Sequence, residues 1–180
     1  MQAEELRALQ APLKERYREN PASALQTLKV QGVLNVDKVT CIVKSTRGPI
    51  EAGLHPSTGG SGEFACSGDM LLEALVGCAG VTLAAVATAL KIPIRAGTLR
   101  AEGDLDFRGT LGVSKEADIG FKAIRLFIDL DTDAPPDQIE SLLKLTERYC
   151  VVFQTLRKTP TMTTVHQAIM GDVGTKPKNS

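Results

Sequence analysis

The sequence predicts an α+β fold in which a mostly antiparallel sheet is wrapped around two long central helices. Apolar and polar residues alternate in several short segments, which is the two-residue period of half-buried strands. Two longer segments, residues 67–90 and 137–158, have the length and apolar content of helices. Because the strands come in groups and do not alternate singly with helices, the pattern favours α+β over a parallel α/β fold.

The chain begins with an amphipathic segment, residues 4–19, which Asn20-Pro21 ends. Its apolar side chains recur at spacings of three and four, at Leu6, Leu9, Leu13 and Tyr17. We therefore expect residues 1–20 to form a helical appendage that either packs on the domain or contacts a partner. The domain is predicted to span residues 21–170, and residues 171–180 are predicted to be a flexible tail.

Three strands are expected next. Residues 28–36 and 38–45 alternate, and turn-forming residues lie where the two segments meet. Arg47-Gly48-Pro49 predicts a second turn, after which residues 49–55 form a short third strand. A loop rich in glycine and serine then leads into the first long helix.

Residues 67–90, SGDMLLEALVGCAGVTLAAVATAL, predict the helix around which the other elements are arranged. Residues 74–90 carry no charge, and a helix that is apolar on all sides is normally a buried one. A membrane span is the alternative. The run is at the short limit for a span, is rich in small residues and has an acidic start without a basic flank. We therefore expect a core helix of a soluble domain and no membrane association.

The same helix has no face that suits water, and a single sheet covers only one side of a helix. Small residues three or four positions apart form a ridge that another helix can approach closely: Gly77, Gly80, Ala84 and Ala87. Either the second long helix or a second subunit must cover this ridge. We expect the second subunit, and hence an obligate homodimer.

The remaining elements follow this helix. Residues 95–107 and 122–131 predict two more strands, with a loop of turn residues between them. Pro135-Pro136 opens the second long helix, residues 137–158, which Pro160 ends. Residues 161–167 are expected to form the last strand.

Composition argues against several classes of function. The 21 basic residues balance the 21 acidic ones, so a nucleic-acid partner is not expected. The N-terminus lacks a charged-then-apolar leader, which favours a cytoplasmic location. The absence of CxxC, with only two histidines, predicts no metal site. The glycine loop at residues 59–62 is not followed by GK[ST], so a phosphate-binding loop is not indicated and no cofactor is expected.

The candidate chemistry lies in the cysteines. Cys78 lies within the central helix and Cys150 lies on the apolar stripe of the second helix. Taken singly, each is readily explained by packing, because free cysteine is among the most buried residue types. If the two helices pack together the sulfurs can meet, and a thiolate beside a second thiol is what a thiol peroxidase needs. Cys41 is expected in a strand core. Cys66 is either a partly exposed loop cysteine or an alternative resolving thiol.

The series GG..G....SGDMLLEALVGC, followed by a helix with ERYCVV, resembles the osmotically inducible protein C and organic hydroperoxide resistance (OsmC/Ohr) family. The resemblance covers about residues 28–167 and includes the 72-residue spacing of the two cysteines. It implies an intertwined α+β homodimer whose central helices are buried between sheets. It also implies a thiol-dependent peroxidase for organic hydroperoxides, with Cys78 as the peroxidatic thiol and Cys150 as the resolving thiol. Val151 stands where the characterised peroxidases have proline, which is more typical of an OsmC-like branch.

Peroxidases of this family also use an arginine and an acidic residue near the first cysteine. By position, the resemblance assigns these roles to Arg47 and Asp69. Each residue has a simpler interpretation, because Arg47 lies in an ordinary turn and Asp69 suits the first turn of a helix. Nine helical residues place Asp69 about 13 Å from Cys78, so it reaches the thiol only from an unwound helix start or from a partner chain.

Three functions follow from these observations. The first is a cytoplasmic, homodimeric peroxidase that reduces organic hydroperoxides and is recycled by an external dithiol. The second is a non-catalytic, small-molecule-binding dimer of the same fold, whose buried cysteines are structural. The third is an interaction module that works through residues 1–20. The reactivity of Cys78 separates the first two.

Overall fold

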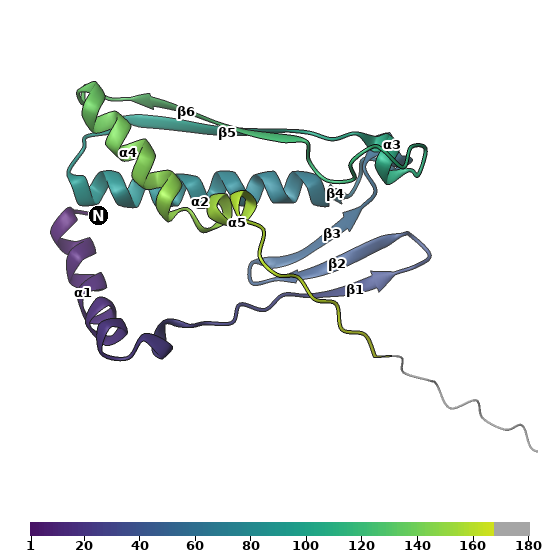
Figure 1. The fold of residues 1–180 in the computed structure, drawn as a ribbon, viewed down its shortest axis with the longest axis horizontal. Coiled ribbons are helices and arrows are strands. Elements are labelled where there is room, and N and C mark those ends of the chain that lie inside the picture. The colour runs from purple at the N-terminus through teal and green to yellow at the C-terminus, as the bar shows by residue number, and fades with distance from the viewer. Residues whose placement is uncertain (168–180) are drawn as a thin grey trace, which may run out of the picture.

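The computed structural model describes residues 1–167 and is arranged around one long helix (Figure 1). This helix, α2 (Ser67–Leu90), has 24 residues. A pair of long strands runs along one side of it, and a separate small sheet lies on the other side in this view. The bounds of α2 match the predicted helix at residues 67–90.

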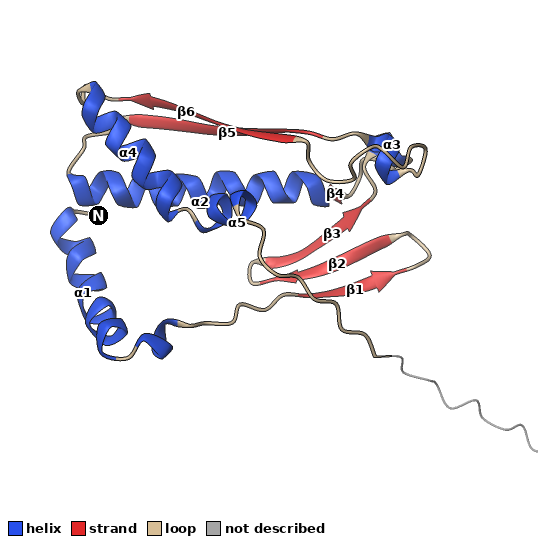
Figure 2. Cartoon of the chain, viewed as in Figure 1, coloured by secondary structure: helices blue, strands red, loops and turns tan. Residues whose placement is uncertain are grey.

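The strands form two sheets instead of one (Figure 2). The first sheet has four strands in chain order: β1 (Gln31–Asn35), β2 (Thr40–Ser45), β3 (Gly48–Gly53) and β4 (Ala65–Cys66). The second is a pair of nine-residue strands, β5 (Ala96–Asp104) and β6 (Ala123–Asp131). All pairs are antiparallel except β3 with β4, so the mostly antiparallel pattern is confirmed.

Helix α2 buries only one stripe of its surface within the chain. Its buried residues recur every four positions and face β5 and the helices that follow it: Leu75, Ala79, Leu83 and Ala87. Val81, on another side, is 74% exposed. A single chain therefore covers one face of α2 and leaves an apolar face open, and the expectation that a second subunit covers that face stays a prediction.

Among the helices in residues 1–167, α2 alone has the length and apolar composition of a membrane span. In this structure it packs against β5 and against the two helices near the C-terminus. Core helices of globular domains share this composition, so the absence of membrane association stays a prediction.

The second long helix is broken at Cys150. Residues expected to form one helix form two, α4 (Pro136–Tyr149) and α5 (Val151–Arg157). Cys150 between them has extended backbone angles, with φ −71° and ψ 109°. The prediction of a continuous helix over 137–158 is therefore wrong, because the apolar stripe on which it rests continues across the break. Cys150 lies at a helix junction and not within a helix.

The two ends of the chain differ from the domain between them. Helix α1 (Ala3–Glu19) confirms the N-terminal helix and stands apart from the strands (Figure 1). It contacts α2 through its first turn, where Ala3 is buried and Glu4 pairs with Lys91 at 2.6 Å. Residues 161–167 form no strand, because alternation alone supplies no partner edge for backbone hydrogen bonds. The predicted tail and the predicted domain end at residue 170 lie outside the described residues.

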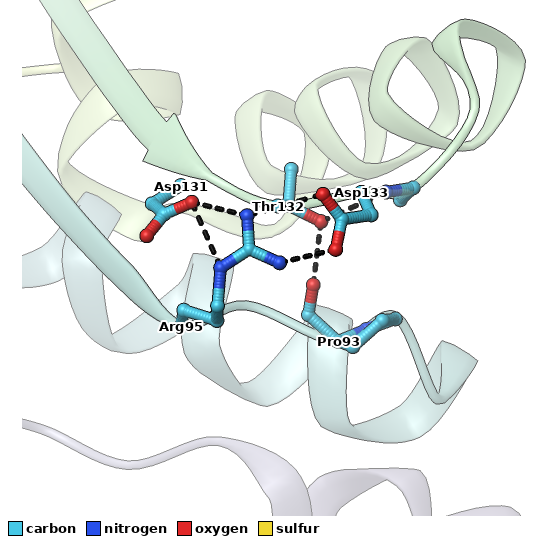
Figure 3. A network of polar contacts seen from close by, with 6 residues as sticks. Pro93, Arg95, Asp131, Thr132 and Asp133 are labelled. Carbon is cyan, nitrogen blue, oxygen red and sulfur yellow. Dashed lines mark hydrogen bonds and ion pairs between the residues drawn. The ribbon is translucent and has the colours of Figure 1, made fainter.

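A polar corner joins the end of α2 to the β5–β6 pair (Figure 3). The Arg95 side chain, just before β5, donates hydrogen bonds to Asp131 and Asp133 at the end of β6. The Thr132 hydroxyl donates to the Pro93 carbonyl oxygen at 2.5 Å. These contacts fix where β6 ends, and therefore where α4 begins its path back across α2.

The short remaining helices lie in the connections: η1 (Pro21–Ala24), η2 (Pro56–Thr58) and α3 (Phe107–Thr110). The last of these falls in the segment that was predicted to be a loop. The stacked rings of His55 and Phe107, with centroids 4.9 Å apart, hold η2 against α3.

Candidate functional site

The structure brings Cys78 and Cys150 together. Cys78 is half-buried near the middle of α2, and Cys150 is 1% exposed at the junction of α4 and α5. Both helices pack on α2, and the Cys150 thiol lies within hydrogen-bonding reach of the Cys78 sulfur. Both cysteines are free thiols. The two residues therefore form a dithiol site, and their chemical roles stay predictions at this point.

The break in the second helix aims backbone donors at both sulfurs. The first N–H groups of any helix lack a carbonyl partner within the helix. In α5 the N–H group of Phe153 donates to Cys150 Sγ at 3.5 Å. The two N–H groups before it, of Val151 and Val152, lower the pKa of the Cys78 thiol. The start of α5 thus acts on both sulfurs.

These donors favour the negatively charged form of Cys78. Burial by itself would raise the pKa of the Cys78 thiol. The Val152 N–H, the Cys150 thiol, the Val151 N–H and the Thr82 hydroxyl together outweigh burial, so the pKa of Cys78 is lowered. A thiolate is thus favoured without an arginine beside it in this chain.

The pKa of the Cys150 thiol is shifted in the opposite direction, upward. Burial raises its pKa, and the Phe153 N–H offsets this only in part. Charge on Cys78 raises the pKa of Cys150 further, because two neighbouring thiolates repel each other. The pair therefore loses its first proton from Cys78, while Cys150 stays a thiol that donates to its neighbour.

A small cavity of about 240 Å³ adjoins Cys150. Its lining combines apolar and polar groups and comes from α2, β6, α4, α5 and the α4–α5 junction: Ala79, Leu126, Ile128, Leu143, Thr146, Glu147, Cys150 and Phe153. A larger cavity, of about 740 Å³, lies elsewhere, between the first turn of α1, the C-terminal half of α2 and the β5–β6 pair. No cysteine lines that larger cavity.

The chain does not bring Arg47 or Asp69 to the dithiol. Arg47 is exposed in the β2–β3 turn, where its N–H bonds to Ser45 Oγ at 3.2 Å. Asp69 is exposed in the first turn of α2 and lines a different cavity. Neither is among the groups that act most strongly on Cys78. Their assigned roles remain predictions that depend on a partner chain.

The other two cysteines are placed away from the pair. Cys66 is half-buried in β4 and lines the Asp69 cavity. Twelve residues of helix separate it from Cys78 by about 18 Å, too far for a disulfide within one chain. Cys41 is half-buried in β2, with its sulfur against Gly32. Within residues 1–167 no cluster of three or more His, Cys, Asp or Glu side chains is able to hold a metal ion.

Sequence reasoning missed the donors that act on Cys78. Val151 and Val152 act through backbone N–H groups, and a backbone donor leaves no signature in side-chain type. Thr82 had a signal, because a residue four positions after Cys78 lies on the same helix face.

Comparison with known proteins places this fold in a family. Residues 60–165 match the model of a family described as "OsmC-like protein". Comparison with curated proteins finds no match. Among solved structures, the OsmC-like protein from Mycoplasma pneumoniae is 18% identical with a TM-score of 0.62, and the match covers 74% of this chain and 89% of that one.

Two further structures carry names that refer to a function. The organic hydroperoxide resistance protein OsmC from Legionella pneumophila is 18% identical with a TM-score of 0.58, covering 74% of this chain and 91% of that one. An organic hydroperoxide resistance protein from Elizabethkingia anophelis is 16% identical with a TM-score of 0.60, covering 75% and 91%. These identities establish a shared fold alone. Since the family match spans more than half of the chain, the chain belongs to the OsmC-like protein family.

Proposed function

We propose that this protein is a thiol-dependent peroxidase that reduces organic hydroperoxides at the Cys78–Cys150 pair. The observation that carries the proposal is the pairing of two free thiols, Cys78 in the middle of α2 and the buried Cys150 at the α4–α5 junction that packs on α2. The directions of the two pKa shifts, lowered at Cys78 and raised at Cys150, support it. A peroxidase needs one thiolate to attack and one nearby thiol to follow. The names of the Legionella and Elizabethkingia structures, organic hydroperoxide resistance proteins, support the same class of substrate.

The reaction divides into two steps that use this chain's sulfurs. The Cys78 thiolate attacks the outer oxygen of the hydroperoxide, so that an S–O bond forms and the O–O bond breaks. The alkoxide takes up a proton and leaves as an alcohol, while Cys78 becomes a sulfenic acid. The Cys150 sulfur then attacks Cys78, forming the S–S bond, and the sulfenic oxygen leaves with the Cys150 proton as water. An external dithiol returns both thiols by exchange.

The surroundings of the pair suit an alkyl peroxide. The cavity beside Cys150, the proposed resolving thiol, includes the apolar side chains of Leu126, Leu143 and Phe153 in its lining. Such side chains bind a hydrocarbon chain, which hydrogen peroxide lacks. We therefore propose alkyl or lipid hydroperoxides as the substrates.

The proposal includes a cytoplasmic homodimer. The open apolar face of α2 supports a second copy, which would also be able to supply a charged residue to the site. Arg47, in an exposed turn of the first sheet, and Asp69 are the candidates for that contribution.

The test is a titration with cumene hydroperoxide. The reduced protein is expected to consume one equivalent per chain and to form a Cys78–Cys150 disulfide, identified by peptide mass spectrometry. Cys78→Ser should abolish consumption. Cys150→Ser should still consume peroxide but stop at a sulfenic acid that dimedone traps, and Cys41→Ser should behave as wild type. A wild-type protein that leaves the peroxide unconsumed would rule the proposal out.

A second function has one observation in its favour. The 740 Å³ cavity between α1, α2 and the β5–β6 pair is within the size range of small-molecule sites and contains no cysteine. A small-molecule-binding dimer with structural cysteines would account for it. A Cys78 that resists both peroxide and alkylating reagents at neutral pH would favour this function.

A further inference from the structure

We propose that Thr82 is a further functional residue of the dithiol site, whose hydroxyl turns from the Cys78 carbonyl oxygen to the Cys78 sulfur when that sulfur becomes negatively charged. The proposal deepens the peroxidase function, on which its catalytic meaning rests. It concerns the thiolate itself, however, and is measurable whether or not peroxide is consumed.

The argument starts from helix geometry. Thr82 lies four residues after Cys78 in α2, and a helical Cβ tilts toward the N-terminus. The Thr82 side chain therefore lies over the turn that contains Cys78. Its hydroxyl donates to the Cys78 carbonyl oxygen at 2.8 Å. Residues four apart on a helix are neighbours on one face, so the hydroxyl lies beside the Cys78 side chain and contributes to the lowered pKa of that thiol.

One hydroxyl cannot serve both acceptors at once, because it has a single hydrogen. The Cys78 carbonyl is already an acceptor of the helix, so it loses little when the hydroxyl turns away. The Cys78 thiolate gains more from an added donor than the carbonyl loses, since hydrogen bonds to charged groups are about twice as strong as neutral ones. The charge on the sulfur thus decides where the hydrogen points.

The other groups around Cys78 do not supply a hydroxyl that turns toward the charged sulfur. The two α5 donors are backbone groups of Val151 and Val152, which are fixed in place and act in every charge state. On the packed elements, Cys150 is the titratable neighbour, and Glu147 of α4 lines the cavity next to it. Thr82 is therefore the donor that side-chain substitution removes without moving either helix.

The same helix supplies a matched control. The Thr88 hydroxyl donates to the Ala84 carbonyl oxygen at 2.8 Å, which is the same contact without a sulfur beside it. Thr88→Val therefore repeats the chemical change of Thr82→Val at a position ten residues from Cys78. Thr82→Ser keeps a hydroxyl, and Thr82→Ala is a second deletion in case valine packs poorly.

The experiment measures the pH profile of Cys78 alkylation by iodoacetamide, read from the Cys78 peptide by mass spectrometry in the reduced full-length protein. We expect Thr82→Val and Thr82→Ala to raise the apparent pKa of Cys78 by about 1, which slows alkylation at pH 7 about tenfold. Thr82→Ser and Thr88→Val should keep the wild-type profile. An unchanged profile in both deletions, or an equal shift in Thr88→Val, would overturn the inference.

Peroxide consumption is followed in parallel to separate the two proposals. If the wild-type protein consumes no peroxide and the Thr82 variants still raise the pKa of Cys78, the Thr82 inference is supported and the peroxidase proposal is wrong. If the Thr82 variants consume peroxide at the wild-type rate and keep the wild-type alkylation profile, the peroxidase proposal stands and the Thr82 inference is wrong.

Discussion

At the residue scale, the pKa values of two neighbouring thiols shift in opposite directions, because the hydrogen-bond donors around them are divided unequally. Cys78 receives the N–H groups of Val151 and Val152 together with the Cys150 thiol. Cys150 receives chiefly the Phe153 N–H and faces the charge of Cys78. Burial alone would have left both protonated and inert.

This asymmetry predicts the pH dependence of thiol reactivity. The thiolate is the reactive form, so alkylation rises with pH and is half-maximal at the pKa. An ordinary cysteine has a pKa of about 8.5. Because the pKa of Cys78 is lowered and that of Cys150 raised, the alkylation rate of Cys78 should reach half of its maximum at a lower pH than that of Cys150. Peptide mass spectrometry after timed iodoacetamide treatment measures both.

Removing Cys78 provides the internal control for this prediction. In Cys78→Ser the negative charge that raises the pKa of Cys150 is gone, so the Cys150 profile should move toward lower pH. A Cys150 profile that stays in place would mean that the two thiols do not titrate as neighbours.

The sequence was sufficient for part of this site. Cys78 and Cys150 were predictable as a pair, because each lies in a long apolar segment of the sequence and two such segments pack together in the core. The donors were not, since they come from a backbone break that the apolar stripe around Val151 does not reveal. An arginine was expected to activate Cys78, and in this chain backbone N–H groups act there instead.

At the scale of elements, the sequence predicts a helix or strand well when neighbouring residues determine it, and poorly when packing against distant segments does. Helix α2 was predicted to its terminal residues, because its apolar run and its ending near Pro93 are local features. The break at Cys150 and the division of the strands into two sheets depend on tertiary packing between segments that are distant in the sequence. The strand expected at residues 161–167 failed for the same reason, since pairing is a tertiary property.

The loop at residues 59–62 shows what the structure adds to a glycine-rich motif. Gly59 and Gly62 have φ of +91° and +82°, values that favour glycine. Gly60 is glycine for another reason, because a Cβ there would lie 1.8 Å from the Leu54 carbonyl oxygen. The glycines of this loop are thus explained by the path of the backbone.

This close approach predicts a loss of stability in Gly60→Ala. The methyl group would collide with backbone atoms of Leu54, which have no rotamer to move into. Overpacking of this kind costs roughly 1–3 kcal/mol, measurable as a lower midpoint of urea unfolding. Gly120→Ala is the matched control, because no atom lies within 4 Å of its added Cβ. Equal urea-unfolding midpoints for Gly60→Ala and Gly120→Ala would contradict the prediction, because they would mean that the loop adjusts to the added methyl group without loss of stability.

At the scale of the whole molecule, the single chain leaves a large amount of apolar side chain in contact with solvent. On α2 the exposed residues include Leu71, Val81 and Leu90. Leu34 of β1 is 77% exposed and Val151 of α5 is 71% exposed. Folded monomers seldom show extended apolar patches, and such patches mark interfaces. A second copy is the occupant that accounts for the open face of α2 with no further protein, because the symmetry of a homodimer brings the same face of both chains together.

The open face of α2 gives the last prediction, on oligomeric state. If α2 meets its copy there, Val81→Glu buries a carboxylate without a partner and should convert a dimer into a monomer, as measured by light scattering coupled to size-exclusion chromatography. Val113→Glu is the control, because Val113 lies in a loop and is 72% exposed against 74% for Val81. The control should remain dimeric. A wild-type protein that is monomeric at micromolar concentration, or a Val81→Glu variant that stays dimeric, would mean that this face has another partner.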